Sequence, residues 1–280
     1  MRSLAPSLST RALCTSRMRL VVCRAMLPPR IKAVLFDIDG TLTHSDDLHL
    51  SVFREVLQEL GYDSGRPIDA AFFKARISGR HNPEIFADLF PSLSAARHEE
   101  LAEDKEARFR ALATSSLRPL PGLREFAEML QCRGVPVAAV TNAPRLNVRN
   151  CSRKRTSLHL TPAPPTPPQA ELMLRSVGLE AFFGEQLVIG AECTRAKPAP
   201  DPYLEGLRRL GVSSCDAIAF EDSPSGLQAA VAAGLATVGI LTTQEGNVLL
   251  QAGAAAVVYD FRDELLWNAL GEPAPKSFAP

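Results

Sequence analysis

Apolar and polar positions follow two different periods along this chain of 280 residues. Some short segments are continuously apolar and rich in β-branched residues; these are KAVLFD, VPVAAVT, AIAFED, ATVGI and AAVVYD. Between them, segments such as GLREFAEMLQCRG and PDPYLEGLRRLG carry apolar residues at helical spacing. Continuous apolar strands that alternate with amphipathic helices are typical of a parallel sheet covered on both faces. The pattern therefore predicts an α/β fold with a doubly wound, Rossmann-like parallel sheet as its core.

The stretch after the first predicted strand departs from this alternation. It contains the segments SVFREVLQELG, IDAAFFKARI, NPEIFADLF and SAARHEELAEDKEARFRALA, which are helical in period and are not interrupted by a strand pattern. We therefore expect an all-helical cap domain at residues 45–115, inserted into a core formed by residues 31–44 and 116–280.

Residues 1–30 contain six arginines, no acidic residue and no continuous apolar core. This composition is typical of a disordered organelle transit peptide rather than of a secretory signal. VVCRA is similar to a stromal processing site, so the favoured destination is the chloroplast, with the mitochondrion or the cytoplasm as alternatives. A disordered start or an initiation codon at Met18 or Met26 would also explain the segment.

A second basic segment, Val148–Gln169, contains four basic residues, no acidic residue and five prolines near its end. Proline prevents helix formation and the segment offers no apolar face, so we expect it to be disordered or extended. Its removal would join TNAPRLN to AELMLRSVGL in one amphipathic pattern. Because valine codons begin with GT and one glutamine codon ends with AG, a translated retained intron is the favoured origin. A genuine loop or a proline-rich partner-binding segment are the alternatives.

Charge and cysteine content exclude several classes of partner. Outside the two basic segments the chain has 21 basic and 31 acidic residues, which gives no reason to expect nucleic acid as a partner. No stretch approaches the roughly 20 uninterrupted apolar residues of a membrane span. The six cysteines are scattered without paired spacing, which favours a reducing compartment and neither disulfides nor a zinc site. We expect a monomer or a weak dimer.

Two acidic residues directly follow the first apolar strand, in the sequence VLFDIDGTL. Ligands in sheets of this kind bind outside the carboxyl ends of the strands, so Asp37 and Asp39 should face a common cleft. The first carboxylate could accept a phosphoryl group, and the second could protonate a leaving oxygen and later activate water. Acid pairs also occur in turns and helix caps, so this pair alone does not specify a function.

Three further groups accompany the acid pair. Thr141 and Asn142 end the segment AAVTN and offer a hydroxyl and an amide suited to phosphate oxygens. Lys197 precedes a predicted helix, and Glu221 with Asp222 ends IAFED with oxygen ligands that suit magnesium. Singly, these residues could be a turn hydroxyl, a solvated lysine and a helix-capping pair. Their ordered occurrence after apolar strands makes a shared site the better interpretation.

The ordered set DIDGT, VTN, the isolated lysine and EDSPSG resembles that of the haloacid dehalogenase-like hydrolases, from Ile31 to about Asp260. Within that superfamily, the chain is most similar to plant sugar-phosphate phosphatases and β-phosphoglucomutases, which carry a helical cap after the first strand. The resemblance implies that Asp37 is the nucleophile and Asp39 the general acid and base. It also implies Mg²⁺ held by Asp37, the Asp39 carbonyl and Asp222, with Glu221 in support.

The same resemblance assigns residues to phosphate and substrate binding. Thr141 and Lys197 would bind the phosphoryl group. FFKARISGRHN is similar to a cap loop whose arginine binds a second polar or phosphate group, which here is Arg80, with Lys74 nearby. His49 matches a histidine that contacts the acid/base region in the mutases. A solvated helix end and a packing histidine are the alternatives.

These residues predict a magnesium-dependent phosphatase that acts on small phosphomonoesters, most simply sugar or polyol phosphates, through an aspartyl-phosphate intermediate. Asp39 favours phosphate chemistry over dehalogenation, because a halide leaves without a proton. A phosphosugar mutase shares the same motifs and is the main alternative. A catalytically impaired chain that acts as a binding module is a third.

Overall fold

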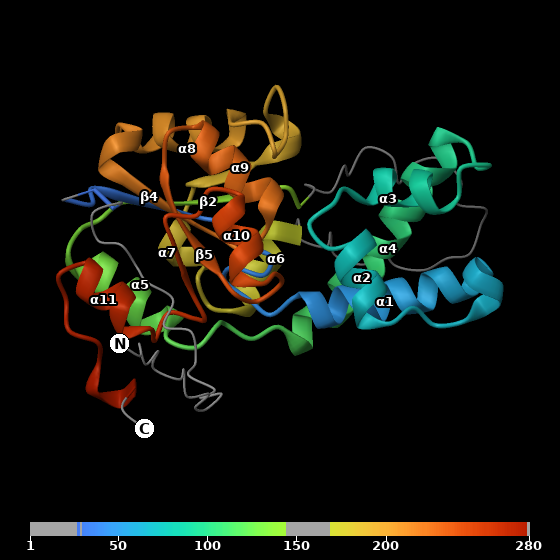
Figure 1. The fold of residues 1–280 in the computed structure, drawn as a ribbon, viewed down its shortest axis with the longest axis horizontal. Helices are drawn as coiled ribbons and strands as arrows, with labels where there is room; N and C mark the ends of the chain where they lie inside the picture. Colours follow the sequence, from blue (N-terminus) through green and yellow to red (C-terminus); the bar gives the residue numbers. More distant parts are fainter. Residues whose placement is uncertain (1–26, 29, 144–168, 279–280) are drawn as a thin grey trace, which may run out of the picture.

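The computed structural model describes residues 27–28, 30–143 and 169–278 (Figure 1). The predicted transit peptide, apart from its last few residues, and the proline-rich segment up to Pro168 lie outside the described residues. Gln169 differs from the prediction, because it is the first residue of a helix and is buried. Glutamine is a good helix former, and the buried Ala170 and Leu172 that follow it hold this turn against the core.

One six-stranded sheet forms the core, in the order β3-β2-β1-β4-β5-β6, and every neighbouring pair of strands is parallel. The strands are β1 (Ala33–Phe36), β2 (Val137–Thr141), β3 (Leu187–Ile189), β4 (Ala217–Glu221), β5 (Ala236–Ile240) and β6 (Ala256–Val258). The chain builds the sheet outward from β1 in one direction and then, from β4 on, in the other. This confirms the doubly wound α/β fold.

The strand β3 was missing from the sequence-based prediction. Its apolar run, Leu187–Ile189, is only three residues long and lies between polar residues and a glycine. It is nevertheless buried at the edge of the sheet, where Val188 pairs with Val140 of β2. A run this short gives no periodic signal that separates a strand from a turn.

The two faces of the sheet carry side chains of different size. On one face Phe36 and Phe220 stack with ring centroids 5.2 Å apart and pack against Phe126 of α5 (Leu123–Cys132). On the other face small residues such as Ala219 let α8 (Asp201–Leu210) and α9 (Pro224–Ala232) approach closely. Gly206 of α8 lies so near Leu35 that a β-carbon there would collide with it. In Figure 1, α8 and α9 cover one side of the sheet, and α5 and α11 (Glu264–Ala269) cover the other.

The remaining elements of the core are short. They are α6 (Gln169–Ser176), α7 (Glu180–Phe183), α10 (Gly246–Gln251) and the 3₁₀ turns η4 (Gly190–Glu192), η5 (Ser214–Asp216) and η6 (Lys276–Phe278). None of the helices in the described part of the chain is long and apolar enough to cross a membrane. Cys132, Cys193 and Cys215, the cysteines that the structure describes, are free thiols.

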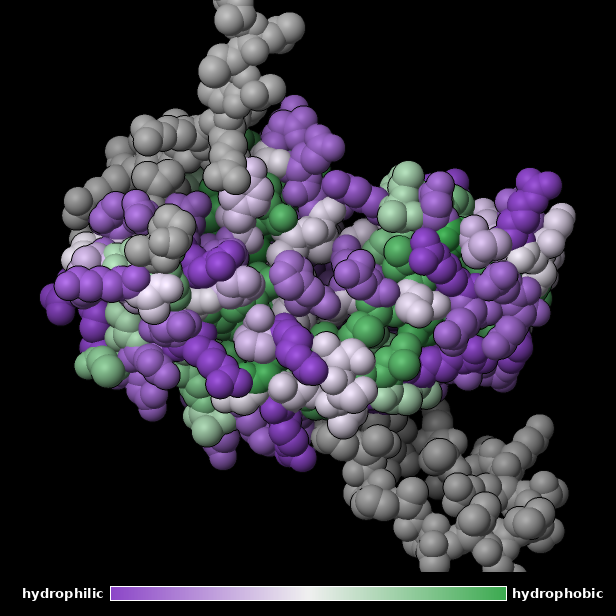
Figure 2. Space-filling view, turned by 90° about the horizontal axis from the view of Figure 1, so that it is seen from below, coloured by the Kyte–Doolittle hydropathy of each residue, from purple (hydrophilic) through white to green (hydrophobic). Residues whose placement is uncertain are grey.

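A helical cap lies beside the sheet, between β1 and α5 in the sequence (Figure 1). It consists of α1 (Asp46–Glu59), η2 (Tyr62–Gly65), α2 (Ala70–Arg76), α3 (Asn82–Leu89) and α4 (Ala95–Ser116). The chain enters and leaves the cap at adjacent points, because the Leu120 N–H donates to the Leu42 carbonyl at 2.9 Å and Thr43 pairs with Pro119. Figure 2 shows hydrophilic residues over much of one face of the molecule, with apolar residues in smaller patches between them.

Candidate active site

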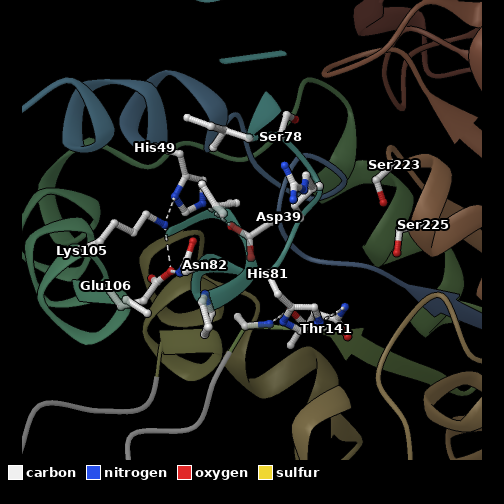
Figure 3. A pocket seen from close by; sticks show the side chains of 18 of the residues that line it. Asp39, His49, Ser78, His81, Asn82, Lys105, Glu106, Thr141, Ser223 and Ser225 are labelled. Atoms are coloured by element: carbon white, nitrogen blue, oxygen red, sulfur yellow. Dashed lines mark hydrogen bonds and ion pairs between the residues drawn. The ribbon is translucent and has the colours of Figure 1, made fainter. Parts of the chain in front are cut away.

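The predicted motif residues meet at one edge of the sheet. Asp37 directly follows β1, Thr141 is the last residue of β2, and Glu221 is the last residue of β4. Because these three strands are parallel neighbours, their carboxyl ends open into the same space. That space is a cleft of about 380 Å³, lined by Asp37, Thr141 and Asp222 on one side and by the cap on the other (Figure 3).

Lys197 is a buried structural link rather than a solvated surface lysine. Its side chain is only 4% exposed, and Nζ donates to Asp37 Oδ1 at 2.7 Å and to Glu221 Oε1 at 2.7 Å. A third bond goes to the Val140 carbonyl at 2.8 Å. All three ammonium protons therefore have acceptors, and the charge of Lys197 lies between two carboxylates.

Glu221 is completely buried and is held by the protein at both oxygens. Besides Lys197, the Tyr203 hydroxyl donates to Oε1 at 2.7 Å, and the Asp222 N–H donates to Oε2 at 3.2 Å. Gly226, in the first turn of α9, leaves room for this carboxylate, since a β-carbon there would overlap it. Glu221 is thus fixed in place, and no pattern in the sequence indicates its contact with Tyr203.

The acidic residues of the cleft have the chemistry of a divalent-cation site. Asp37, Glu221 and Asp222 are buried, and each offers an oxygen within 4.8 Å of the others. Burial, reinforced by the neighbouring carboxylates, raises the pKa of Asp37 in spite of Lys197, and burial with the charges of Asp37 and Glu221 raises that of Asp222. When all three acids are ionised, the single positive charge of Lys197 does not balance their negative charges. Buried carboxylate oxygens in excess of positive charge fit Mg²⁺, which prefers oxygen ligands.

Gly40 and Thr41 bring the turn after β1 against the carboxylate of Asp222. Gly40 has φ of 77°, and a β-carbon there would collide with the Asp222 carboxylate. The Thr41 hydroxyl donates to Asp222 Oδ1 at 3.2 Å. The glycine of the DIDGT motif is thus needed for two reasons: it adopts the left-handed backbone conformation, and it lets the turn lie directly against the Asp222 carboxylate.

Asp39 is connected to two buried charges of the cap. His49 Nε2 lies 3.2 Å from Asp39 Oδ1, and Lys105 Nζ lies 2.8 Å from His49 Nδ1. Lys105 also donates to Glu106 Oε1 at 2.8 Å (Figure 3). An ammonium can only donate, so Nδ1 of His49 accepts and its Nε2–H donates to Asp39. The chain of hydrogen bonds thereby fixes the tautomer of His49 and the position of Asp39.

Lys105 is almost fully buried, with a side chain that is 2% exposed. Its ammonium lies 5.1 Å from the ring centroid of Phe53 and 5.4 Å from that of Phe109. Both rings stabilise the charge in addition to Glu106. No sequence pattern distinguishes Lys105 or Glu106, because adjacent charged residues in a helix rich in charge are usually solvated.

The end of β2 places a hydroxyl and an amide in the cleft, and the protein already bonds to both of them. Thr141 lines the cleft, and its Oγ1 accepts from the Ala143 N–H at 2.9 Å. Asn142 Oδ1 accepts from the Lys197 N–H at 3.2 Å, and Asn142 Nδ2 donates to the Lys197 carbonyl at 3.3 Å. The amide that we expected to hold phosphate oxygens is therefore bonded to the backbone of Lys197, although Asn142 also lines the cleft.

The cap loop contributes Arg80 but not Lys74 to the cleft. Arg80 lines the cleft, while its Nη1 donates to the Arg76 carbonyl at 2.8 Å and to Asp88 at 3.1 Å. Lys74 is exposed on α2 and is not among the lining residues. A lysine in the last turn of a short helix points to solvent unless a partner holds it, so the sequence alone could not separate these two cations.

A family model described as haloacid dehalogenase-like hydrolase matches residues 31–234. The chain belongs to this family. The match confirms the resemblance seen in the motifs, and it spans the cap together with the sheet from β1 to α9.

Relatives of this haloacid dehalogenase-like hydrolase include named phosphatases. The chain is 29% identical over 249 residues to the phosphorylated carbohydrates phosphatase of Thermotoga maritima, covering 86% of this chain and 99% of the relative. A relative from Arabidopsis thaliana named SUPPRESSOR OF QUENCHING 1, chloroplastic, is 26% identical over 232 residues, which are 81% of this chain and 19% of that protein.

Solved structures of the family share the fold along most of their length. A HAD hydrolase from Entamoeba histolytica has a TM-score of 0.69 at 25% identity, covering 86% of this chain and 98% of that one. A protein from Thermotoga maritima described as a putative β-phosphoglucomutase has a TM-score of 0.59 at 27% identity, covering 86% and 99%. Hydrolase and mutase names therefore both occur among similar structures.

Proposed function

We propose that this hydrolase is a magnesium-dependent phosphatase of small phosphomonoesters, such as sugar or polyol phosphates, and that it works through an aspartyl-phosphate on Asp37. The observation that carries the proposal is the contact of Asp37 with Lys197 at the carboxyl end of β1, opposite a cap that encloses the cleft. The name of the phosphorylated carbohydrates phosphatase supports the substrate class.

In the first step an Asp37 oxygen attacks phosphorus, the bond from phosphorus to the ester oxygen breaks, and protonated Asp39 gives its proton to the leaving alcohol. In the second step Asp39 takes a proton from water, the water oxygen attacks phosphorus, and the bond to Asp37 breaks. Inorganic phosphate leaves, and both carboxyl groups return to their starting states. His49 holds Asp39 in position for both proton transfers.

The chain's own groups offset the charge that develops on phosphorus. Lys197 is fixed beside Asp37, and the Thr141 hydroxyl lines the cleft at the neighbouring strand end. Asp37, the Asp39 carbonyl and Asp222 would hold Mg²⁺, with Glu221 as a support fixed by Tyr203 and Lys197. When bound, the metal supplies positive charge that reduces the repulsion between carboxylate and phosphate.

A phosphosugar mutase is the second candidate, favoured by the likeness to a putative β-phosphoglucomutase. The deciding experiment incubates the purified protein and Mg²⁺ with a panel of phosphomonoesters and measures inorganic phosphate. In parallel, β-glucose 1-phosphate with a catalytic amount of the 1,6-bisphosphate is assayed for glucose 6-phosphate. Phosphate release should dominate, whereas isomerisation much faster than release would establish the mutase instead.

We also propose that residues 1–30 direct the chain to the chloroplast. Their composition supports this, as does the word chloroplastic in the name of the Arabidopsis relative. Fusion of residues 1–30 to a fluorescent protein should produce chloroplast fluorescence in leaf cells. Fluorescence confined to mitochondria or to the cytoplasm would contradict the assignment.

A further inference from the structure

Glu106 of α4 is a buried carboxylate with one unoccupied acceptor in the wall of the cleft. The residue is 4% exposed and lines the cleft on the cap side. Its Oε1 accepts from Lys105 Nζ and from Asn82 Nδ2. Its Oε2 has no hydrogen-bond partner among the described residues. Buried polar atoms are almost always hydrogen-bonded, so the unpartnered oxygen of a residue that lines the cleft points to a partner that the described residues do not supply.

The charge of Glu106 restricts that group to a hydrogen-bond donor. Burial disfavours the ionised carboxylate, but the charge of Lys105 and the hydrogen bonds from Lys105 and Asn82 outweigh this effect and lower the pKa of Glu106 to about 2. An ionised carboxylate only accepts hydrogen bonds. A second phosphate on the substrate would be repelled at this position, whereas a hydroxyl would be bound.

The position of Glu106 indicates that a substrate hydroxyl bonded to it belongs to the leaving alcohol. The phosphate end of the cleft is formed by Asp37, Thr141 and Lys197 of the core. Glu106 belongs to the opposite wall, and Lys105 and His49 connect it to Asp39, the residue that would protonate the leaving oxygen. Figure 3 shows Lys105 between His49 and Glu106 on this wall.

We propose that Glu106 Oε2 accepts a hydrogen bond from a hydroxyl of the leaving alcohol, and that the enzyme thereby selects phosphate esters of polyhydroxy alcohols over simple alkyl phosphates. This inference rests on the proposed phosphatase function and adds a specificity-determining residue to it.

Glu106→Gln is the informative substitution. The amide oxygen can stay with Lys105 and Asn82, which puts the amide NH₂ where Oε2 was, so a donor replaces the acceptor. Glu103→Gln is the matched control, because Glu103 lies on the same helix and lines the same cleft. The Glu103 side chain is 60% exposed and is already bonded to Arg110.

The experiment compares kcat/KM for sorbitol 6-phosphate and n-hexyl phosphate, which have the same carbon chain with and without hydroxyls. Wild type should prefer sorbitol 6-phosphate by about 10- to 100-fold, the range of one hydrogen bond to a charged group. Glu106→Gln should reduce this ratio by about tenfold or more, because kcat/KM falls for sorbitol 6-phosphate and not for n-hexyl phosphate. Glu103→Gln should reduce the ratio by less than about threefold.

An equal loss on both esters in Glu106→Gln would show a purely structural role and overturn the inference. If that variant fails to fold, Glu106→Asp is used instead, because it keeps the negative charge beside Lys105 but shortens the side chain and moves the carboxylate away from the position of Oε2. An unchanged ratio of the two kcat/KM values in Glu106→Asp would equally overturn the inference. A wild-type ratio near one, with hydrolysis that Asp37→Asn abolishes, would overturn the inference and leave the phosphatase proposal standing. Absence of phosphate release from every ester would overturn the phosphatase proposal itself.

Discussion

The ammonium group of Lys197 donates a hydrogen bond of 2.7 Å to Oδ1 of Asp37, although 160 positions separate the two residues in the sequence. The same ammonium binds Glu221, so one cation holds together two of the acids of the cleft. Catalysis by the proposed route requires Asp37 to be a nucleophile and not merely the partner of Lys197.

Asp37→Asn should abolish turnover while leaving the fold intact, because an amide cannot form the aspartyl-phosphate. We expect at least the roughly 10²-fold loss in kcat that a single positioned catalytic group supplies. Circular dichroism and thermal unfolding should show a folded variant. Retention of more than about 1% of wild-type activity would exclude covalent catalysis by Asp37.

Tyr203→Phe should weaken the support of Glu221 without disturbing the packing of the ring. Tyr203 is fully buried and donates to Glu221 at 2.7 Å, so its loss should reduce the free energy of unfolding by roughly 0.5–1.5 kcal/mol and should lower kcat. Tyr259→Phe is the control, since Tyr259 is 66% exposed. Urea unfolding and steady-state kinetics would test this, and identical results for the two variants would refute the role of Tyr203.

Stability without metal should fall with rising pH. In the folded chain the pKa of Asp37 is raised from 3.8 to about 8. An acid with a raised pKa contributes stability that is complete below its unfolded pKa and is lost as the pH rises through its folded pKa. The metal-free enzyme should therefore lose stability between about pH 4 and pH 8, and Mg²⁺ should raise Tm more at pH 8 than at pH 6.

Asp222→Asn provides the control for that titration. It removes one buried carboxylate, so the metal-free variant should be more stable than wild type at pH 8 and should respond little to Mg²⁺. Asp222→Ala should also reduce magnesium affinity far more than Glu221→Ala, because both oxygens of Glu221 are already bonded to protein groups. Equal Mg²⁺ titrations for these two alanine variants would contradict the ligand assignment.

Deletion of Val148–Gln169 should preserve activity and raise Tm if this segment is a translated intron. The deletion joins Asn147 to Ala170, at the start of the helix whose Leu172 and Met173 are buried in the core. Sequencing of the transcript tests independently whether the segment is a retained intron. A deletion that abolishes activity, or mature messages that nearly all contain the segment, would favour a genuine functional loop.

The sequence predicted most of the sheet because its central strands are long, continuously apolar and followed by polar motif residues. It also predicted which residues meet, since parallel strands open at a common edge: Asp37, Thr141, Lys197 and Asp222 all line the cleft. The prediction failed in the cap, whose helices have no strand ends to indicate which residues meet. Lys105 and Glu106 are ordinary helix-surface residues by spacing, and only the position of His49, 56 residues away, shows that this charge pair is buried.

Asn142 shows a second limit of prediction from the sequence. Its place after a strand correctly predicted a residue of the cleft, but residue type alone cannot distinguish an amide that binds phosphate from one that binds a neighbouring loop. In the structure the amide of Asn142 is bonded to the backbone of Lys197, 55 positions later in the chain, and its Nδ2 also lies 3.2 Å from His81 Nε2. Contacts of this kind depend on loop geometry, which hydrophobic periodicity does not encode.

The paired backbone of Leu42 and Leu120 makes the cap a replaceable module. The two ends of the cap lie next to each other at the sheet, so the whole cap is inserted at a single position, as a short loop would be. Segments whose ends lie close together can be exchanged with little effect on the host fold. Grafting a different helical cap between Leu42 and Leu120 should therefore leave Asp37 and Lys197 in place while changing which alcohols reach them.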